Sequence, residues 1–338
     1  MGPERSSTGG PDTAGGRPIV AITAPLPASA LEVLASAGEI RSPELPPPLP
    51  VEALHRLIGG VDAAVTLLHN RVDGAFLDVA GPGLRVVANV AVGYDNVDVA
   101  ACAARGVVVT NTPGVLTDAT ADLAMALILI ATRRLGEGER LIRSGTSWEW
   151  GLDFHLGAGL QGKTLGIVGL GQIGQATARR ARAFGMAVVY AGRRRVAPEV
   201  EAELDAVHLP LPDLLATADV ISLHSPLTPE TRHLIGRAEL ASMKPTAFLV
   251  NTARGPVVDE EALVEALRAG TIAGAGLDVF EREPAVHPGL LELENVVLLP
   301  HLGSATVETR TAMTVLAARN VAAVLAGEPA LTPVSPRR

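Results

Sequence analysis

The 338-residue chain contains one cysteine, Cys102, and more acidic than basic residues. A single cysteine cannot form an intramolecular disulfide, and it offers no cluster of soft ligands for a structural zinc, so we predict no metal site. The net charge of −8 argues against a nucleic-acid-binding protein, because phosphate contacts need a basic surface. We therefore expect a small-molecule partner rather than a nucleic acid.

Long apolar runs and leader-like segments are also missing. The longest apolar run, residues 123–132, lies between Asp122 and Arg133 and is shorter than the roughly 20 residues needed to cross a bilayer. Residues 1–17 are rich in Gly, Ser, Thr and Pro and lack the apolar stretch of a signal peptide. These features predict a disordered N-terminal tail, no membrane partner and a cytoplasmic location.

What the chain does contain is an alternation of short β-rich runs with longer helical stretches. This alternation is typical of parallel sheets joined by right-handed crossovers, and the length suits two domains, so we predict a doubly wound α/β fold. The runs are nearly continuous in Val and Leu, as expected of strands covered on both faces. The predicted strands are 18–23, 63–68, 84–90 and 106–112, followed by 164–168, 188–190, 220–224, 247–252, 273–279 and 296–300; the clearest helices are 28–37, 118–134, 175–184 and 306–326.

Two helices suggest how the domains are connected. The helix at 118–134 is apolar on all sides, so we expect it to be buried between packed elements and to link the domains. The final helix at 306–326 needs a partner, and the first α/β unit is the natural place for it to return. The sequence thus predicts a Rossmann domain, residues 116–303, inserted in a discontinuous flavodoxin-like substrate domain made of residues 18–115 and 304–338.

A glycine-rich motif, GLGQIG, follows the predicted strand at 164–168 and opens a helix. Gly169 permits the tight turn, Gly171 allows the backbone to approach a pyrophosphate, and Gly174 allows close helix packing. The helix N-terminus would face the anion. This arrangement predicts a dinucleotide site, whereas the alternative is an ordinary glycine-rich turn.

The end of the next strand bears on which dinucleotide is bound. An NAD site usually has Asp or Glu there for the ribose hydroxyls, but this chain has Ala191 and Gly192, followed by Arg193, Arg194 and Arg195. Guanidinium groups suit a 2′-phosphate, which an acid would repel. The turn therefore favours NADP(H), with NAD(H) still possible if the arginines are only a solvated surface run.

Three polar residues stand at the carboxyl ends of predicted strands in the second unit: Arg254, Glu283 and His301. Ligands bind at that edge of open α/β sheets, so these side chains could converge. An imidazolium can donate a proton to a carbonyl that receives a hydride, a carboxylate can hold that imidazolium, and a guanidinium can clamp a substrate carboxylate. Each residue alone also has a purely structural explanation.

From about Val20 to Pro329 the sequence resembles the D-isomer-specific 2-hydroxyacid dehydrogenases, and within them the glyoxylate/hydroxypyruvate reductases. The motifs that carry the resemblance are VAVGYDNVD, NTPGVLTDATADLA, GKTLGIVGLGQIG, LHSPLTPETRHLI, MKPTAFLVNTARGPVVDEEAL, AGAGLDVFEREP and LLPHLGSAT. Their agreement in order and spacing covers nearly the whole chain. Related formate dehydrogenases differ in carrying Gln in place of Glu283.

The resemblance implies a role for each matching residue. Arg254 would bind and polarise the substrate, His301 would be the acid/base, and Glu283 would pair with His301. Backbone N–H groups of Val92 and Gly93 would bind the substrate carboxylate, with Leu68 nearby. The implied cofactor contacts are Gln172 and Ile173 at the phosphates, Gly192, Arg193 and Arg194 at the ribose phosphate, and Thr252, Asp278 and Gly303 around the nicotinamide.

Assembly and function follow as expectations. The apolar helix, hard to cover with one domain, and the aromatic segment with Trp148 and Trp150 predict a homodimer. The resemblance implies that this segment belongs to the dimer contact and that one tryptophan, either Trp148 or Trp150, can reach the neighbouring active site. The leading functional prediction is an NADPH-preferring reductase of glyoxylate or hydroxypyruvate. One alternative is an NAD-dependent D-2-hydroxyacid dehydrogenase for a larger 2-keto acid. The other is a nucleotide-sensing binding protein similar to corepressors that use this fold.

Overall fold

The computed structural model describes residues 16–335, and the chain divides into two compact units. Unit 1 comprises residues 1–112 and 313–338, and unit 2 comprises residues 113–312. The predicted disordered tail, residues 1–17, lies outside the described residues except for its last two, of which Arg17 donates a hydrogen bond to the Ala35 carbonyl. Unit 2 is therefore an insertion between two segments of unit 1.

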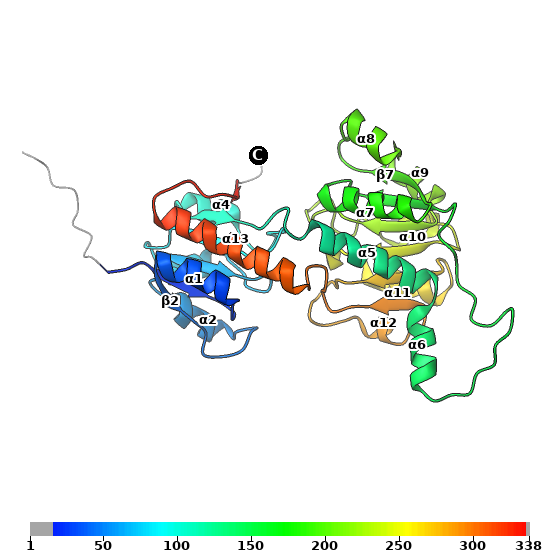
Figure 1. Cartoon of the computed structure of the whole chain (residues 1–338), viewed down its shortest axis with the longest axis horizontal. Coiled ribbons are helices and arrows are strands. Elements are labelled where there is room, and N and C mark those ends of the chain that lie inside the picture. Colours follow the sequence, from blue (N-terminus) through cyan, green and yellow to red (C-terminus); the bar gives the residue numbers. More distant parts are fainter. Residues whose placement is uncertain (1–15, 336–338) are drawn as a thin grey trace, which may run out of the picture. The chain divides into compact units, whose positions relative to one another are not determined.

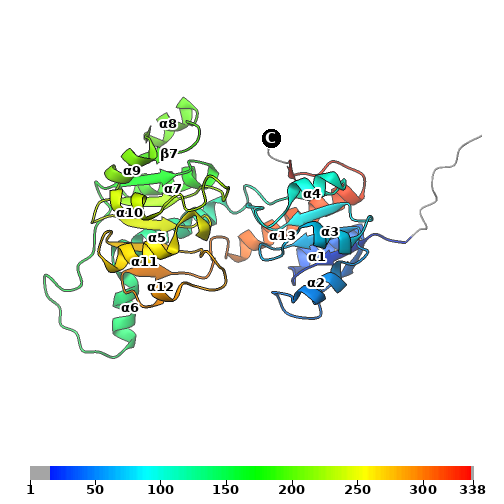
Figure 2. The ribbon, with the colours of Figure 1, turned by 180° about the vertical axis from the view of Figure 1, so that it is seen from behind.

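Unit 1 is built on a six-stranded sheet in the order β13-β5-β4-β3-β1-β2, counted over the described residues. The five strands before β13 are parallel, and β13 is antiparallel to β5. Figure 1 shows α1 and α13 on one face of this sheet, and Figure 2 shows α2, α3 and α4 on the other. The elements are β1 (Ile19–Ile22), α1 (Ala28–Ala37), β2 (Glu39–Arg41), α2 (Val51–Ile58), β3 (Ala63–Thr66), α3 (Gly74–Ala80), β4 (Val86–Asn89), α4 (Val99–Ala104), β5 (Val108–Thr110), α13 (Val307–Leu325) and β13 (Pro333–Val334).

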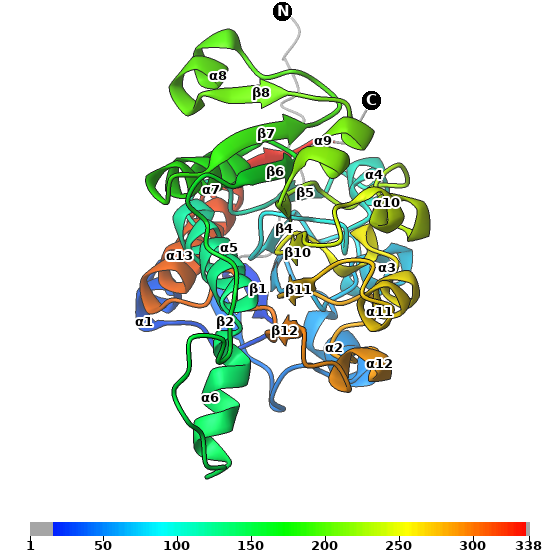
Figure 3. The same cartoon turned by 90° about the vertical axis from the view of Figure 1, so that its right-hand side faces the viewer.

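Unit 2 contains a parallel seven-stranded sheet, again within residues 16–335, in the order β12-β11-β10-β9-β6-β7-β8 (Figure 3). The order reverses between β6 and β9, which is the switch point where ligands bind in open α/β sheets. The elements are α5 (Thr117–Thr132), α6 (Leu135–Arg143), β6 (Thr164–Val168), α7 (Gln172–Ala183), β7 (Ala187–Ala191), α8 (Pro198–Leu204), β8 (Ala206–His208), α9 (Leu211–Thr217), β9 (Val220–Leu223), α10 (Arg237–Ser242), β10 (Phe248–Asn251), a 3₁₀ turn η1 (Gly255–Val257), α11 (Glu260–Arg268), β11 (Gly274–Leu277), α12 (Pro288–Leu291) and β12 (Val296–Leu298).

Each face of the seven-stranded sheet has its own apolar core. On one face, side chains of α5 and α7 pack on the strands, with Leu127, Ile128 and Ala178 fully buried. On the other face, α9, α10 and α11 supply residues such as Leu214 and Leu263. Coverage on both faces explains why these strands are continuous apolar runs instead of alternating ones. The two parallel-sheet α/β domains predicted from the sequence are therefore confirmed.

Helix α5 corrects two expectations. It lies wholly in unit 2, so it is not a link shared by the domains. Packing within unit 2 also buries most of its apolar residues, among them Met125, Leu127 and Ile128, so a second subunit is not needed to cover it. The division between the units instead falls inside α13, between Ala312 and Met313.

Exposed apolar side chains concentrate in α6 and the segment that follows it. Figures 1 and 3 show both extending away from the unit 2 sheet. The exposed residues there include Leu135, Ile142, Trp148, Trp150, Leu152, Phe154 and Leu156. Among the described helices, none is long and apolar enough to cross a membrane.

Candidate active site

His301 and Glu283 form a direct pair in unit 2. Nδ1 of His301 lies 2.7 Å from Oε2 of Glu283, and Oε1 of Glu283 accepts a hydrogen bond of 3.0 Å from the Phe280 N–H. Burial favours the neutral acid, but the hydrogen bond and charge of His301, the Phe280 N–H and the charge of Arg254 together hold the pKa of Glu283 below its ordinary value. With Nδ1 facing the carboxylate, Nε2 is the nitrogen left to exchange a proton with a substrate.

The loop that carries His301 is held by Asp278. Asp278 directly follows β11, is fully buried, and accepts hydrogen bonds of 2.6 Å from the Leu302 N–H and 2.8 Å from the Gly303 N–H. Burial raises the pKa of Asp278, although these two N–H groups oppose that shift. His301 itself has a positive φ of 54°, a costly conformation for a residue other than glycine. The surroundings thus fix His301 in one strained position at the strand end.

Arg254 follows β10 in a turn shaped by Asn251. The Asn251 side chain donates a hydrogen bond of 2.9 Å to the Arg254 carbonyl and accepts one of 3.0 Å from the Ala253 N–H. Nη1 of Arg254 donates to the Ala253 carbonyl at 2.8 Å, and the guanidinium is near enough to lower the pKa of Glu283, against the opposing effect of burial. The three predicted catalytic side chains therefore gather at the carboxyl edge of one sheet.

A second strand-end histidine, His224, has different properties. It follows β9, and its Nε2 lies 2.9 Å from Oγ of Ser222. Burial lowers the pKa of His224 to about 4. Its imidazole is therefore neutral at physiological pH and cannot serve as the cationic proton donor.

The glycine-rich turn between β6 and α7 has the geometry of a phosphate cradle. Gly169 has a φ of 97°, and a Cβ there would lie 2.9 Å from the Ser225 backbone nitrogen. A Cβ on Gly174 would lie 2.5 Å from the Gly169 carbonyl oxygen, whereas a Cβ on Gly171 would meet nothing within 4 Å. Helix α7 begins at Gln172, three residues before the predicted start at Gln175, and Gly171 gives no side-chain cap. The N–H groups of the first turn, which includes Gln172 and Ile173, therefore point to an anion site.

Two buried hydroxyls at neighbouring strand ends also suit a dinucleotide. Oγ1 of Thr252, after β10, and Oγ of Ser225, after β9, have no hydrogen-bond partner within the described part of the chain. Buried polar atoms without partners are costly, and the hydroxyl and amide groups of a dinucleotide could satisfy them. Thr252 was named as a cofactor contact through the family resemblance, whereas Ser225 was missed, although its position after an apolar strand was a signal that could have found it.

The three arginines of the turn after β7 differ in their contacts. Arg195 binds Glu201 through two hydrogen bonds of 2.7 Å, and the Tyr190 hydroxyl donates to the same carboxylate at 2.5 Å. These contacts lower the pKa of Glu201 to about 2, with the Arg195 hydrogen bond the largest cause. Arg193 and Arg194, beside exposed Gly192, are exposed and show no partner among residues 16–335. Two of the three guanidiniums therefore remain available for a phosphate.

In unit 1, the predicted substrate loops are joined by asparagine side chains. Nδ2 of Asn96 donates to the carbonyls of Leu67 and Asn70 at 3.2 Å and 2.9 Å, and the amides of Asn96 and Asn89 bond to each other. These contacts tie the loop with Leu68 to the loop with Val92 and Gly93. This amide network was not recognised from the sequence, because an Asn at a strand end or in a loop gives no signal of its partners.

The backbone of the Val92–Gly93 loop is oriented for donation. Their carbonyls accept hydrogen bonds from Asn111 and Asn89 at 2.9 Å and 3.1 Å. Within the described residues, the N–H groups of Val92 and Gly93 have no partner. Both N–H groups are therefore available to a carboxylate.

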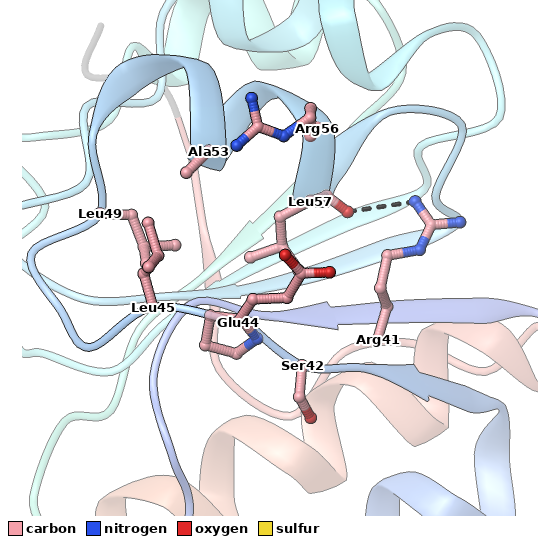
Figure 4. Close-up of a pocket in the computed structure, with 9 residues that line it drawn as sticks. Arg41, Ser42, Glu44, Leu45, Leu49, Ala53, Arg56 and Leu57 are labelled. Atoms are coloured by element: carbon pink, nitrogen blue, oxygen red, sulfur yellow. Dashed lines mark hydrogen bonds between the residues drawn. The ribbon is translucent and has the colours of Figure 1, made fainter.

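A pocket elsewhere in unit 1 lies between β2 and α2 (Figure 4). It has a volume of about 170 Å³ and is lined by Arg41, Glu44, Leu49 and Arg56, among others. Arg41 already donates to the carbonyls of Leu57 and Gly59, at 3.1 Å and 2.7 Å. None of the predicted site residues lines this pocket, so it is not the candidate active site.

The sequence matches the family model described as D-isomer specific 2-hydroxyacid dehydrogenase, NAD binding domain, over residues 125–303. It is 50% identical over 317 residues to the glyoxylate reductase of Thermococcus litoralis, covering 92% of this chain and 95% of the relative. The glyoxylate reductase of Aeropyrum pernix is 48% identical over 318 residues, covering 92% and 94%.

Solved structures show the same architecture over nearly the whole chain. A protein from Thermus thermophilus has a TM-score of 0.86 at 45% identity, covering 94% of this chain and 99% of that chain. The NADPH-dependent glyoxylate/hydroxypyruvate reductase from Sinorhizobium meliloti, in complex with NADP and malonate, has a TM-score of 0.81 at 37% identity, covering 96% and 99%. The chain therefore belongs to the D-isomer specific 2-hydroxyacid dehydrogenases and is an NAD(P)-dependent oxidoreductase acting on CH–OH groups.

Proposed function

We propose that this enzyme is an NADPH-preferring reductase that converts glyoxylate to glycolate and hydroxypyruvate to D-glycerate. The observation that carries the proposal is the His301–Glu283 pair, with 2.7 Å between Nδ1 and Oε2, at the carboxyl edge of a dinucleotide-type sheet. Curated relatives at about 50% identity are named glyoxylate reductases, and a structural neighbour is a glyoxylate/hydroxypyruvate reductase bound to NADP. The substrates in the names of these proteins favour a short 2-keto acid.

In this proposal the cofactor is held by the glycine-rich turn, the arginine turn and residues at the strand ends of unit 2. The Gly169–Gly174 turn and the first turn of α7, with Gln172 and Ile173, would bind the pyrophosphate. Arg193 and Arg194, with Gly192, would bind the 2′-phosphate, while Thr252, Asp278 and Gly303 would lie around the nicotinamide. The reduced nicotinamide, when bound, supplies a hydride to the substrate carbonyl carbon.

Residues of the chain would bind the substrate and supply the proton. Arg254 would clamp the substrate and polarise its carbonyl, while the Val92 and Gly93 N–H groups bind the substrate carboxylate beside Leu68. His301 would give the Nε2 proton to the carbonyl oxygen as that oxygen gains the electron pair of the C=O bond. Glu283 holds the resulting imidazole by Nδ1, and solvent restores the proton.

The homodimer remains part of the proposal, on a revised basis. The exposed apolar residues of α6 and the following segment, including Trp148 and Trp150, form a surface of the type that a second subunit covers. Sedimentation equilibrium at micromolar concentration should give twice the chain mass. A monomer would contradict this part of the proposal. The cytoplasmic location likewise stays a prediction from the sequence.

A steady-state panel tests the function directly. Glyoxylate, hydroxypyruvate, pyruvate and phenylpyruvate would each be reduced with NADPH and with NADH. The proposal predicts the highest kcat/KM for glyoxylate or hydroxypyruvate with NADPH. Preference for phenylpyruvate with NADH would support the dehydrogenase for larger 2-keto acids instead. Cofactor binding without turnover of any of the four would support a nucleotide-sensing binding protein.

A further inference from the structure

The turn that carries Glu283 is in close contact with another segment of unit 2. This catalytic turn, residues 280–283, follows β11, and Glu283 must lie within hydrogen-bond distance of His301 for the pair to exist. The neighbouring segment, residues 254–260, contains Arg254, the η1 turn and the start of α11. Two of its residues contact the catalytic turn.

The first contact is made by the backbone of Gly255, which has no side chain to keep the catalytic turn away. A Cβ at this position would overlap the carbonyl of Phe280 and the backbone nitrogen of Glu281. The two backbones can therefore lie this close only because residue 255 is glycine. Since Gly255 is bonded to Arg254, this contact also sets the spacing between the turn with Arg254 and the turn with Glu283.

Glu260 makes the second contact through a buried carboxylate. Its Oε1 accepts a hydrogen bond of 2.6 Å from the Glu281 N–H, and the residue is 7% exposed at the start of α11, where Asp259 caps the helix. Burial raises the pKa of Glu260, and the charge of Glu281 acts in the same direction, while the hydrogen bond from the Glu281 N–H and the charges of His287 and Arg282 oppose the shift. A carboxylate is costly to bury, so the contact of this buried group with the catalytic turn calls for an explanation.

A third contact comes from the side chain of Glu281. Its Oε1 lies 2.5 Å from Nε2 of His233, close enough for an ion pair when His233 is protonated, although the alignment does not satisfy hydrogen-bond geometry. Glu260 and His233 therefore hold the backbone and side chain of the same residue. Since Glu281 is two residues from Glu283, its fixed position restricts where the Glu283 carboxylate can lie.

We propose that Glu260 is a positioning residue, which together with Gly255 holds the catalytic turn so that Glu283 meets His301. This inference rests on the proposed roles of Arg254, Glu283 and His301. In the absence of the Glu260 acceptor, the Glu281 N–H loses its buried partner and the turn shifts. The His301–Glu283 contact then lengthens, while the glycine-rich cofactor turn, on different strands, is unaffected.

The test compares Glu260→Leu with Glu260→Gln. The leucine variant has no acceptor, so we expect kcat for 2-keto acid reduction to fall about 100-fold, as a small displacement of a catalytic group can cause. The glutamine variant keeps a carbonyl oxygen for the Glu281 N–H and should recover most of the rate. The dissociation constant for NADPH, measured by calorimetry, should be unchanged in both. Glu261→Gln is the matched control, because the neighbouring Glu261 is exposed and pairs with His287.

The pH profile separates positioning from simple stabilisation. In Glu260→Leu the alkaline limb of kcat should move toward lower pH, because His301 has lost its carboxylate partner. A lower Tm with kcat and the pH profile of wild type would overturn the proposal, and so would a glutamine variant as impaired as leucine. The wild type is assayed first with the four-acid panel, and the variants with its best substrate, so a wrong substrate assignment is recognised independently of the Glu260 result. If leucine denatures at 25 °C, Glu260→Ala replaces it in the same comparison.

Discussion

The carboxyl ends of the two sheets carry polar side chains of opposite character. In unit 2 they include the titratable groups Asp278, Arg254, Glu283 and His301, of which Glu283 and His301 are in direct contact. In unit 1 the corresponding edge carries neutral groups, namely Thr23, Asn70, Asn89 and Asn96, bonded to one another and to backbone carbonyls. Proton transfer needs groups that titrate, whereas holding loop backbone for carboxylate recognition needs fixed dipoles. We therefore propose a division of roles, in which titratable groups of unit 2 serve the proton transfer and fixed dipoles of unit 1 serve carboxylate recognition.

The largest effect is expected from His301→Ala, which removes the proposed proton donor. Loss of general acid catalysis should reduce kcat for glyoxylate about 1,000-fold. His224→Ala should have a far smaller effect on kcat, because burial lowers the pKa of His224 to about 4 and keeps that imidazole neutral. Steady-state kinetics with NADPH would measure both variants. Equal losses of kcat in the two variants would contradict the assignment of His301, and not His224, as the proton donor.

The next effect concerns the arginine turn of unit 2. Replacing Arg193 and Arg194 with Ala should raise KM for NADPH about 10-fold per arginine, since each charge-assisted contact contributes roughly 1.5 kcal/mol or more. KM for NADH should change little, because that cofactor lacks the 2′-phosphate. Arg105→Ala, an exposed arginine of unit 1 paired with Asp78, is the charge control. Equal changes for both cofactors would mean that the arginines do not recognise the phosphate.

The smallest effect is expected at the neutral edge of unit 1. Asn96→Ala leaves the Leu67 and Asn70 carbonyls without their donor, at a cost of about 1–3 kcal/mol in the free energy of unfolding. KM for the keto acid should rise while kcat at saturation stays near wild type. Asp62→Ala is the control, because Asp62 binds the Ile19 N–H at the amino end of the same sheet. It should lower Tm without changing KM; a kcat loss in Asn96→Ala would contradict the proposed division.

Residue type and position relative to strands made much of the fold and of the unit 2 site predictable. The strand at 164–168 and the helix at 28–37 have the predicted bounds, and Glu283 and His301, expected at strand ends, lie in contact. Short elements were missed: β2 has three residues, and β13 has two and is defined mainly by its pairing with β5. Their patterns are too short for periodicity to detect.

Other contacts between separate segments were not predictable from the sequence. Glu260 follows a helix cap in an acidic stretch and has the pattern of an exposed first turn, yet its carboxylate is buried against Glu281. The apolar circumference of α5 suggested an interface, whereas strands and α7 of its own unit cover it. In both cases the partner lies far away in sequence, and periodicity describes only the helix itself.

The most direct test is the pH dependence of glyoxylate reduction in wild type and Glu283→Gln. Burial opposes ionisation of Glu283, but His301, Phe280 and Arg254 lower its pKa, so the stabilising carboxylate is present at neutral pH and lost only as pH falls through that lowered value. Glutamine keeps the shape but has no charge at any pH. With a deuterium isotope effect on hydride transfer showing that chemistry limits the rate, the alkaline limb of kcat should shift to lower pH in Glu283→Gln. Superimposable profiles under the same condition would contradict the proposed acid–base pair.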